Sequence, residues 1–260
     1  MGARVLLSLA TGTSIAAAAG YLGSLMLSRR MALVAGPLGH LTLPGVALAL
    51  LYGFDMSLGA FPFVLLGVVL IWLFEIRTKL PMEALTAIVF ASGVAIAFLF
   101  LPLSEAETAL VGDVLKVGTA DTVLSVVASL ALILAVNRLY RRLVLINISE
   151  DLAASAGADV KRDNFLYLFL IAIIVALGVK VVGSLLTAAL VAIPPAAVRP
   201  LSKNLRQYAL GSMVIGAISA LLGIMLSELT SLPAGPLIIL VSTAIFLLTL
   251  LRVKSQGSRP

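Results

Sequence analysis

Apolar runs fill almost the whole chain, and they constrain its fold more than any other feature. Nine of them lie at 5–27, 33–53, 58–76, 84–103, 122–140, 165–180, 183–198, 208–227 and 233–251. A helix needs about 20 apolar residues to cross the roughly 30 Å hydrocarbon core of a bilayer. The sequence therefore predicts an all-α, polytopic membrane protein with about nine transmembrane helices.

The composition excludes a soluble fold. Hydrophobic residues make up 61% of the 260 positions and charged residues only 12%, whereas a soluble domain carries about 25% charged residues. The mean hydropathy is +1.17, and a globule of this size would still need a polar surface. We expect one transmembrane domain over residues 1–260, with no separate soluble domain.

The second and seventh runs contain helix breakers, so we expect these segments to be broken or short. The breakers are Gly36, Pro37, Gly39, Pro44 and Gly45 in the second run and Pro194 and Pro195 in the seventh. Pro195 lacks a backbone donor and leaves the carbonyl of Val191 unpaired. Such a carbonyl either lines a substrate path or marks a simple kink, and broken membrane helices require cover from protein or a cavity.

The charges indicate an orientation. In the nine-span topology, fifteen of the eighteen Lys and Arg residues fall on one side, and only Arg4, Lys116 and Lys180 fall on the other. Because Lys and Arg accumulate on the cytoplasmic side, the amino terminus is predicted outside and the carboxyl terminus in the cytoplasm. Topology thus explains the net charge of +6, and no nucleic-acid partner is expected.

The chain lacks residues that several classes of enzyme require. The chain has no cysteine and one histidine, so a thiolate metal site or a Cys/His catalytic pair within one chain is excluded. No Gly-Lys pair is present, which removes the phosphate-binding loop that ATP hydrolysis uses. The protein is predicted to be no enzyme and to bind no cofactor itself.

Small residues recur every fourth position in two of the runs. The stripes are Gly12, Ala16, Gly20 and Ser24 in the first run and Ser212, Gly216 and Ala220 in the eighth. Such stripes let helix backbones approach closely in lipid. We expect packing within the chain rather than a contact between copies.

The single histidine, His40, lies inside the broken second run. Ionisable groups within a membrane usually face a pathway or a partner. A neutral imidazole bonded to a carbonyl freed by the breaks is the alternative, and the sequence leaves both open.

The longest cytoplasmic loop, at about 147–164, predicts a short exposed helix. Ser149 is suited to cap its start, Glu150 and Asp151 favour its first turn, and Gly157 is suited to its end.

Together, six motifs in register resemble one family, the permease subunits of ABC-3 importers for zinc, manganese or iron. They are Ala35–Gly45, Thr78–Phe90, Leu110–Asp113 with Asp121, Glu150–Gly157, Gly178–Gly183 with its proline pair, and Ser231–Pro236. The resemblance extends from about residue 20 to residue 250.

The resemblance implies a permease that moves a divalent metal ion by alternating access across the plasma membrane. Its expected partners are a cytoplasmic ATPase subunit that binds ATP, an external solute-binding protein, and a second permease copy in a homodimer. The permease copies are surrounded by the lipid bilayer. It implies ATPase coupling through Glu150, Asp151, Ala153 and Gly157. It also implies a substrate pathway along His40, Pro44, Gly45, Pro194 and Pro195, with His40 as the metal contact.

The chain departs from the family signature in one respect. The family has Asp four residues before the histidine and Ser directly before it, where this chain has Gly36 and Gly39. Either His40 pairs with another group, such as its copy in a dimer, or the pathway carries a different solute. Glu83 is a replacement by type, but the predicted topology puts it at the cytoplasmic end of a span. A stand-alone secondary transporter is the alternative function, and it requires buried acids at mid-span, where these boundaries place none.

Overall fold

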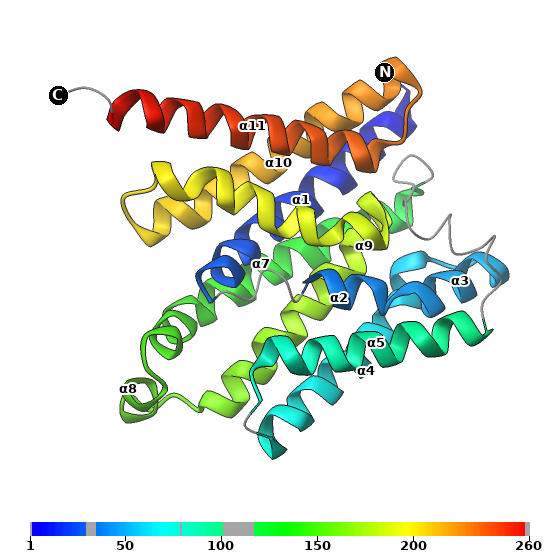
Figure 1. The fold of residues 1–260 in the computed structure, drawn as a ribbon. Helices are drawn as coiled ribbons and strands as arrows, with labels where there is room; N and C mark the ends of the chain where they lie inside the picture. The colour runs from blue at the N-terminus through cyan, green and yellow to red at the C-terminus, as the bar shows by residue number, and fades with distance from the viewer. Residues whose placement is uncertain (1, 30–34, 79, 101–116, 258–260) are drawn as a thin grey trace.

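The computed structural model describes residues 2–29, 35–78, 80–100 and 117–257, and every regular element within them is a helix (Figure 1). The Leu110–Asp113 motif, Arg30, Lys79, Lys116 and Arg259 lie outside the described residues. The elements are α1 (Ala3–Ser28), α2 (Ala35–His40), α3 (Leu43–Tyr52), α4 (Met56–Arg77), α5 (Met82–Phe100), α7 (Thr119–Ile148), α8 (Glu150–Ser155), α9 (Val160–Val198), the 3-10 helix η3 (Arg199–Leu201), α10 (Leu205–Thr230) and α11 (Ala234–Gly257).

The prediction of an all-helical membrane protein is confirmed, whereas the exact count of nine spans is not. Within the described ranges, six helices are long and apolar enough to cross a bilayer, and Ala84–Ala95 and Leu186–Leu201 are shorter apolar helices. The second predicted span forms two short helices, α2 and α3. The sixth and seventh predicted spans together form the 39-residue α9.

The break in α9 lies at Gly183 and not at the proline pair. Gly183 has φ 79° and ψ 169°, a conformation that essentially only glycine adopts. The hydroxyl of Thr187 donates to the Gly183 carbonyl at 2.6 Å, and the helix then continues through Pro194 and Pro195. The two halves of α9 therefore run in different directions (Figure 1).

The two small-residue stripes pack against each other, which confirms the packing within the chain. A Cβ atom on Gly20 of α1 would overlap the carbonyl oxygen of Ser212 in α10, and a Cβ on Gly216 would overlap the carbonyl of Ala16. Glycine at these positions lets the two backbones meet directly, which is how membrane helices gain contact area.

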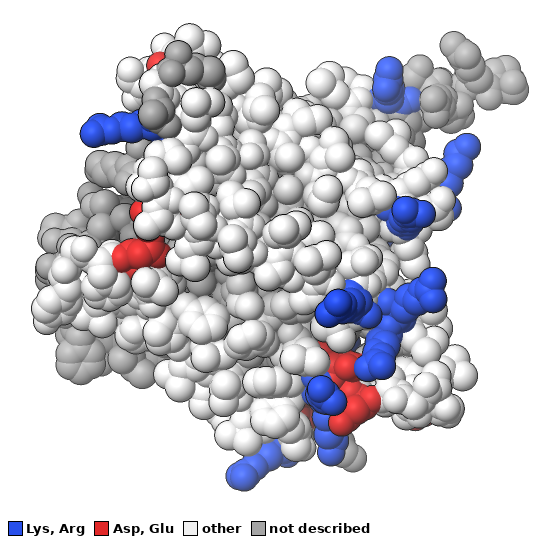
Figure 2. Space-filling view, turned by 180° about the vertical axis from the view of Figure 1, so that it is seen from behind, with Lys and Arg blue, Asp and Glu red and all other residues white. Residues whose placement is uncertain are grey.

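One end of the bundle carries most of the basic residues. The Arg29 guanidinium at the end of α1 donates to Oδ1 of Asn164 in α9 at 2.9 Å and lies 4.9 Å from the ring centre of buried Tyr167. The amide of Asn147 in α7 donates to the carbonyl of Ser28 at 3.1 Å. Figure 2 shows most Lys and Arg atoms along one side of the molecule.

Candidate functional site

His40 is the last residue of α2 and is partly buried. Its ring centre lies 5.5 Å from that of Phe90 in α5, with the ring planes tilted by 45°. Among the described residues, the imidazole has no hydrogen-bond partner. A bond to a freed backbone carbonyl, one of the two alternatives left by the sequence, is therefore not observed in this part of the chain.

The Gly36 position faces the second half of α9. A Cβ on Gly36 would lie 3.4 Å from Cβ of Ala188, which is ordinary van der Waals contact. Gly36 and His40 are one helical turn apart, the spacing at which two side chains lie along the same helix face. Within the described ranges, no three His, Asp or Glu side chains gather closely enough to hold a metal ion around His40 or elsewhere.

Pro44 and Gly45 lie where α3 packs on α4. Pro44 occupies the first turn of α3, where its missing donor costs nothing. A Cβ on Gly45 would overlap the carbonyl oxygen of Gly59, and a Cβ on Gly59 would overlap the carbonyl oxygen of Gly45. The structure thus assigns Gly45 a packing role, because its open face is filled by α4.

Pro194 and Pro195 are buried within α9. The carbonyl of Val191, which Pro195 deprives of its helical donor, packs against Gly23 of α1 so closely that a Cβ on Gly23 would overlap it. The pathway residues predicted from the sequence consequently lie in three different regions of the packing. His40 lies against α5, Gly45 packs on α4, and the Val191 carbonyl that Pro195 leaves unpaired packs on α1.

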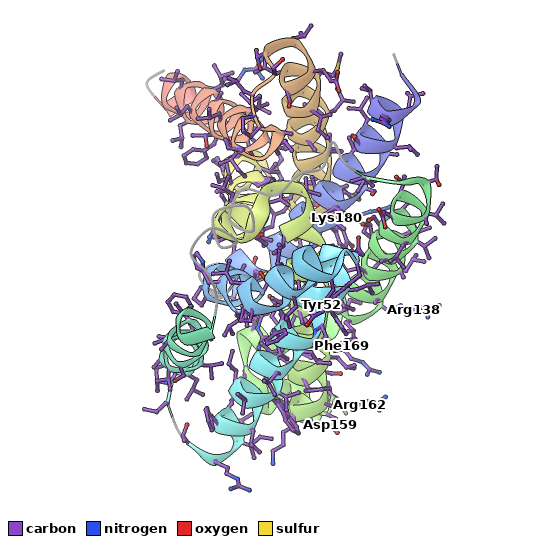
Figure 3. All side chains as sticks on the ribbon, turned by 90° about the vertical axis from the view of Figure 1, so that its right-hand side faces the viewer. Tyr52, Arg138, Asp159, Arg162, Phe169 and Lys180 are labelled. Atoms are coloured by element: carbon purple, nitrogen blue, oxygen red, sulfur yellow. The ribbon has the colours of Figure 1, made fainter. Side chains whose placement is uncertain are left out.

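A buried ion cluster was missed by the sequence reasoning. Lys180 in α9 is 7% exposed, and its ammonium pairs with the carboxylate of Asp55 and lies 3.5 Å from Oδ1 of Asp121. Figure 3 shows Lys180 in the interior near the bend of α9, whereas Arg138 projects from α7. The sequence signal was a single Lys inside a long apolar run, which must find a partner in the protein.

Both acids of the cluster also accept hydrogen bonds from backbone N–H groups at a helix N-terminus. Oδ1 of Asp55 accepts hydrogen bonds from the backbone N–H groups of Ser57 and Leu58 at 2.9 and 3.2 Å, which caps α4. Oδ2 of Asp121 accepts from the N–H of Gly118 at 3.1 Å at the start of α7. The cluster therefore joins the bend of α9 to the first turns of α4 and α7.

The cluster lies far from the basic end of the bundle. Arg162 is in the first turn of α9 and Lys180 follows it in the same helix half, a separation of about 27 Å at 1.5 Å per residue. This is close to the thickness of the hydrocarbon core of a bilayer. The two charged regions thus mark the two ends of the bundle.

The predicted short helix in the 147–164 loop is present as α8. The Ser149 hydroxyl accepts from the N–H of Leu152 at 3.3 Å and caps its start. Gly157 follows its end with φ 80°. The helix lies at one extremity of the molecule, between α7 and α9 (Figure 1).

The exposed surface of α8 differs in one residue from the surface predicted. Glu150, Asp151 and Gly157 are exposed, but Ala153 is fully buried and anchors α8 to the bundle. Leu152 presents the apolar side chain, with 56% of its surface exposed. The exposed surface of α8 and its end consequently includes Glu150, Asp151, Leu152 and Gly157, but not Ala153.

Comparison with known proteins gives consistent matches along nearly the whole chain. The model of a family described as the ABC 3 transport family matches residues 4–253. The manganese transport system membrane protein MntC of Listeria monocytogenes is 24% identical over 254 residues, which cover 96% of this chain and 91% of that protein. The manganese import system permease protein ScaB of Streptococcus parasanguinis is 27% identical over 246 residues, covering 93% and 88%.

A relative named for zinc uptake and a solved structure also match nearly the whole chain. The high-affinity zinc uptake system membrane protein ZnuB of Buchnera aphidicola subsp. Baizongia pistaciae is 25% identical over 248 residues, covering 93% of this chain and 95% of the relative. The structure of PsaBC from Streptococcus pneumoniae in complex with Fab matches with a TM-score of 0.82 at 24% identity, over 96% and 91% of the two chains. This likeness shows that the two chains share a fold.

Proposed function

The chain belongs to the ABC 3 transport family, and we propose that it is the membrane permease of an ATP-driven importer for manganese or zinc. The family match over residues 4–253 carries the proposal. Relatives named for manganese and zinc transport support the metal class, because they cover at least 93% of this chain. Imidazole is a suitable ligand for transition-metal ions, and His40 supplies one.

The ATPase subunit is proposed to dock on α8. This helix is short and exposed at the basic end, and it connects α7 directly to α9. Its surface combines two acids with exposed Leu152, a mixture that suits a protein interface with an apolar centre and a polar rim. We assign this end to the cytoplasm because it carries most of the Lys and Arg residues, which places the amino terminus outside.

The first half of α9 connects α8 to the other side of the membrane, so it can transmit a movement of α8. The first half of α9 begins next to α8 and ends near Lys180, which pairs with Asp55 of α4 and Asp121 of α7. Gly183 then separates this half from the second half, against which α2 packs. A shift of α8 driven by ATP on the partner subunit would thus reach the bend of α9 near Lys180, on the outer side, where we place docking of the solute-binding protein.

His40 is proposed to contact the transported ion. A single imidazole is a weak site, so we propose that two permease copies pair and present two His40 side chains to the pathway. The missing carboxylate at Gly36 leaves this contact with imidazole nitrogens and without a compensating charge.

Co-purification tests the docking surface. Leu152→Arg should abolish recovery of the ATPase subunit with the tagged permease in mild detergent. Leu229→Arg is the control, because Leu229 is 83% exposed and lies at the end of α10, on the opposite side of the bundle from α8. Recovery of the ATPase with the Leu152 variant would remove α8 as the docking site.

Uptake into proteoliposomes tests the substrate. The permease with its ATPase and binding protein should accumulate manganese or zinc only when ATP is present. Accumulation that depends on an ion gradient and not on ATP would instead establish the secondary transporter.

A further inference from the structure

A groove of about 740 Å³ lies between α7 and α10 near the basic end of the bundle. Its lining residues come from α7, α10 and one position of α1: Tyr21, Ile133, Leu134, Asn137, Tyr140, Arg141, Val144, Leu205, Arg206, Ala209, Leu210 and Met213. Neither α8, the proposed docking site of the ATPase, nor His40, the proposed metal contact, is part of it.

The floor of the groove is held by side-chain hydrogen bonds. The hydroxyl of Tyr21 donates to Oδ1 of Asn137 at 3.2 Å, and the hydroxyl of Tyr140 donates to the carbonyl of Leu205 at 3.4 Å. The two tyrosine ring centres are 6.1 Å apart. These contacts link all three helices, so the groove is a defined feature of the packing.

The polar end of the groove is positively charged. Arg141 and Arg206 line it, and its lining contains no acidic residue. The neighbouring Arg142 lies 4.0 Å from Asp163, whereas in the described part of the chain Arg141 and Arg206 have no ion-pair partner. Two arginines with planar, bidentate donors favour an anion such as a phosphate group.

The rest of the groove is apolar. Leu134 precedes Arg141 by seven residues of α7, about 10 Å along the helix, and Ala209, Leu210 and Met213 continue the apolar wall on α10. A free inorganic anion would leave this wall uncovered. A charged head joined to a hydrocarbon chain matches both parts.

We propose that this groove binds an anionic phospholipid, with its phosphate between Arg141 and Arg206 and an acyl chain along Leu134, Leu210 and Met213. Basic pockets between membrane helices at the cytoplasmic face suit such headgroups. A second copy of the chain fits the charge less well. In a two-fold contact the same surface faces itself, which would bring the two arginines of one copy toward those of the other.

Lipid retention tests the site. The full chain is purified in mild detergent from membranes that contain phosphatidylglycerol and phosphatidylethanolamine, and bound lipid is counted by native mass spectrometry. Wild type should retain phosphatidylglycerol selectively. Arg141→Gln with Arg206→Gln should lower that retention at least about tenfold, because each basic residue contributes about a fivefold preference for anionic lipid.

Two further variants separate the site from general effects. Arg138→Gln removes a charge from the same helix outside the groove lining and should retain the lipid. Leu134→Trp fills the apolar part without changing charge, and it should also displace phosphatidylglycerol while the protein remains monodisperse.

Three results would overturn the proposal. They are equal retention of the two lipids by wild type, unchanged phosphatidylglycerol on the double arginine variant, and a change in the number of permease copies with no change in bound lipid. None of these measurements uses transport, so they are independent of the proposed metal import.

Discussion

The ammonium nitrogen of Lys180 lies 3.5 Å from Oδ1 of Asp121, and the same nitrogen pairs with the carboxylate of Asp55. The side chain of Asp55 is 12% exposed and that of Asp121 is 34% exposed. The two ion pairs therefore differ in how much water competes with them. Three helices meet at this one cation, so its loss affects more than a local contact.

Lys180→Met should destabilise the protein by about 3 kcal/mol, because it leaves the largely buried Asp55 carboxylate without its counter-charge. Asp121→Asn should cost no more than about 1 kcal/mol, since this pair is longer and more exposed. Thermal unfolding of the detergent-solubilised chain measures both. Equal effects of the two substitutions would contradict the unequal roles assigned to the pairs.

Gly20→Val should prevent close packing of α1 on α10, because its Cβ would overlap the Ser212 carbonyl. We expect a loss of about 3 kcal/mol, the upper part of the usual range for overpacked interiors, because the overlap is with backbone atoms. Ala10→Val is the control, since Ala10 is an exposed position of the same helix. Size-exclusion profiles and unfolding temperatures compare the two, and similar stability of both variants would disprove the direct backbone contact.

Gly183→Ala should cost about 1–3 kcal/mol, because alanine is strained at φ 79° and ψ 169°. Gly36→Ala provides the matched control, since its Cβ meets Ala188 at 3.4 Å and alanine favours a helix. The difference in unfolding temperature between the variants reports the strain. If Gly183→Ala is as stable as the control, the break in α9 does not depend on glycine.

His40→Ala should reduce ATP-dependent uptake of manganese or zinc at least tenfold if the imidazole touches the ion. Gly36→Asp should tighten equilibrium metal binding, because it adds a carboxylate one turn before His40. Gly36→Asn has nearly the same shape without the charge and should have a smaller effect. Unchanged uptake by the His40 variant would return this residue to a packing role against Phe90.

The features that follow local rules were predictable from sequence. Span composition, the matching small-residue stripes and α8 with its Ser149 cap each depend on residues close together in the chain. Their physical causes are hydrocarbon thickness, backbone proximity and the unpaired N–H groups of a helix start. These predictions agree with the structure for that reason.

Features that depend on distant segments were not predictable in the same way. Lys180, Asp55 and Asp121 lie in three different helical regions, and no spacing rule links them. The positions of the breakers did not reveal that Gly183 interrupts α9 while the proline pair does not. The carbonyl that Pro195 leaves unpaired, at Val191, packs against Gly23 of α1, a contact that the sequence does not indicate. Ala153 lies in the predicted helix. Which face of that helix is buried, however, depends on the contacts of α8 with α7 and α9.

The reciprocal contact between Gly45 and Gly59 also limits how this protein can vary. At most crowded contacts, a larger residue on one side is accommodated by a smaller residue on the other. Here both partners already lack a side chain and each faces the other's carbonyl oxygen, so no exchange at one position makes room for a change at the other. In a library that randomises both positions together, we expect the glycine pair to be recovered almost exclusively.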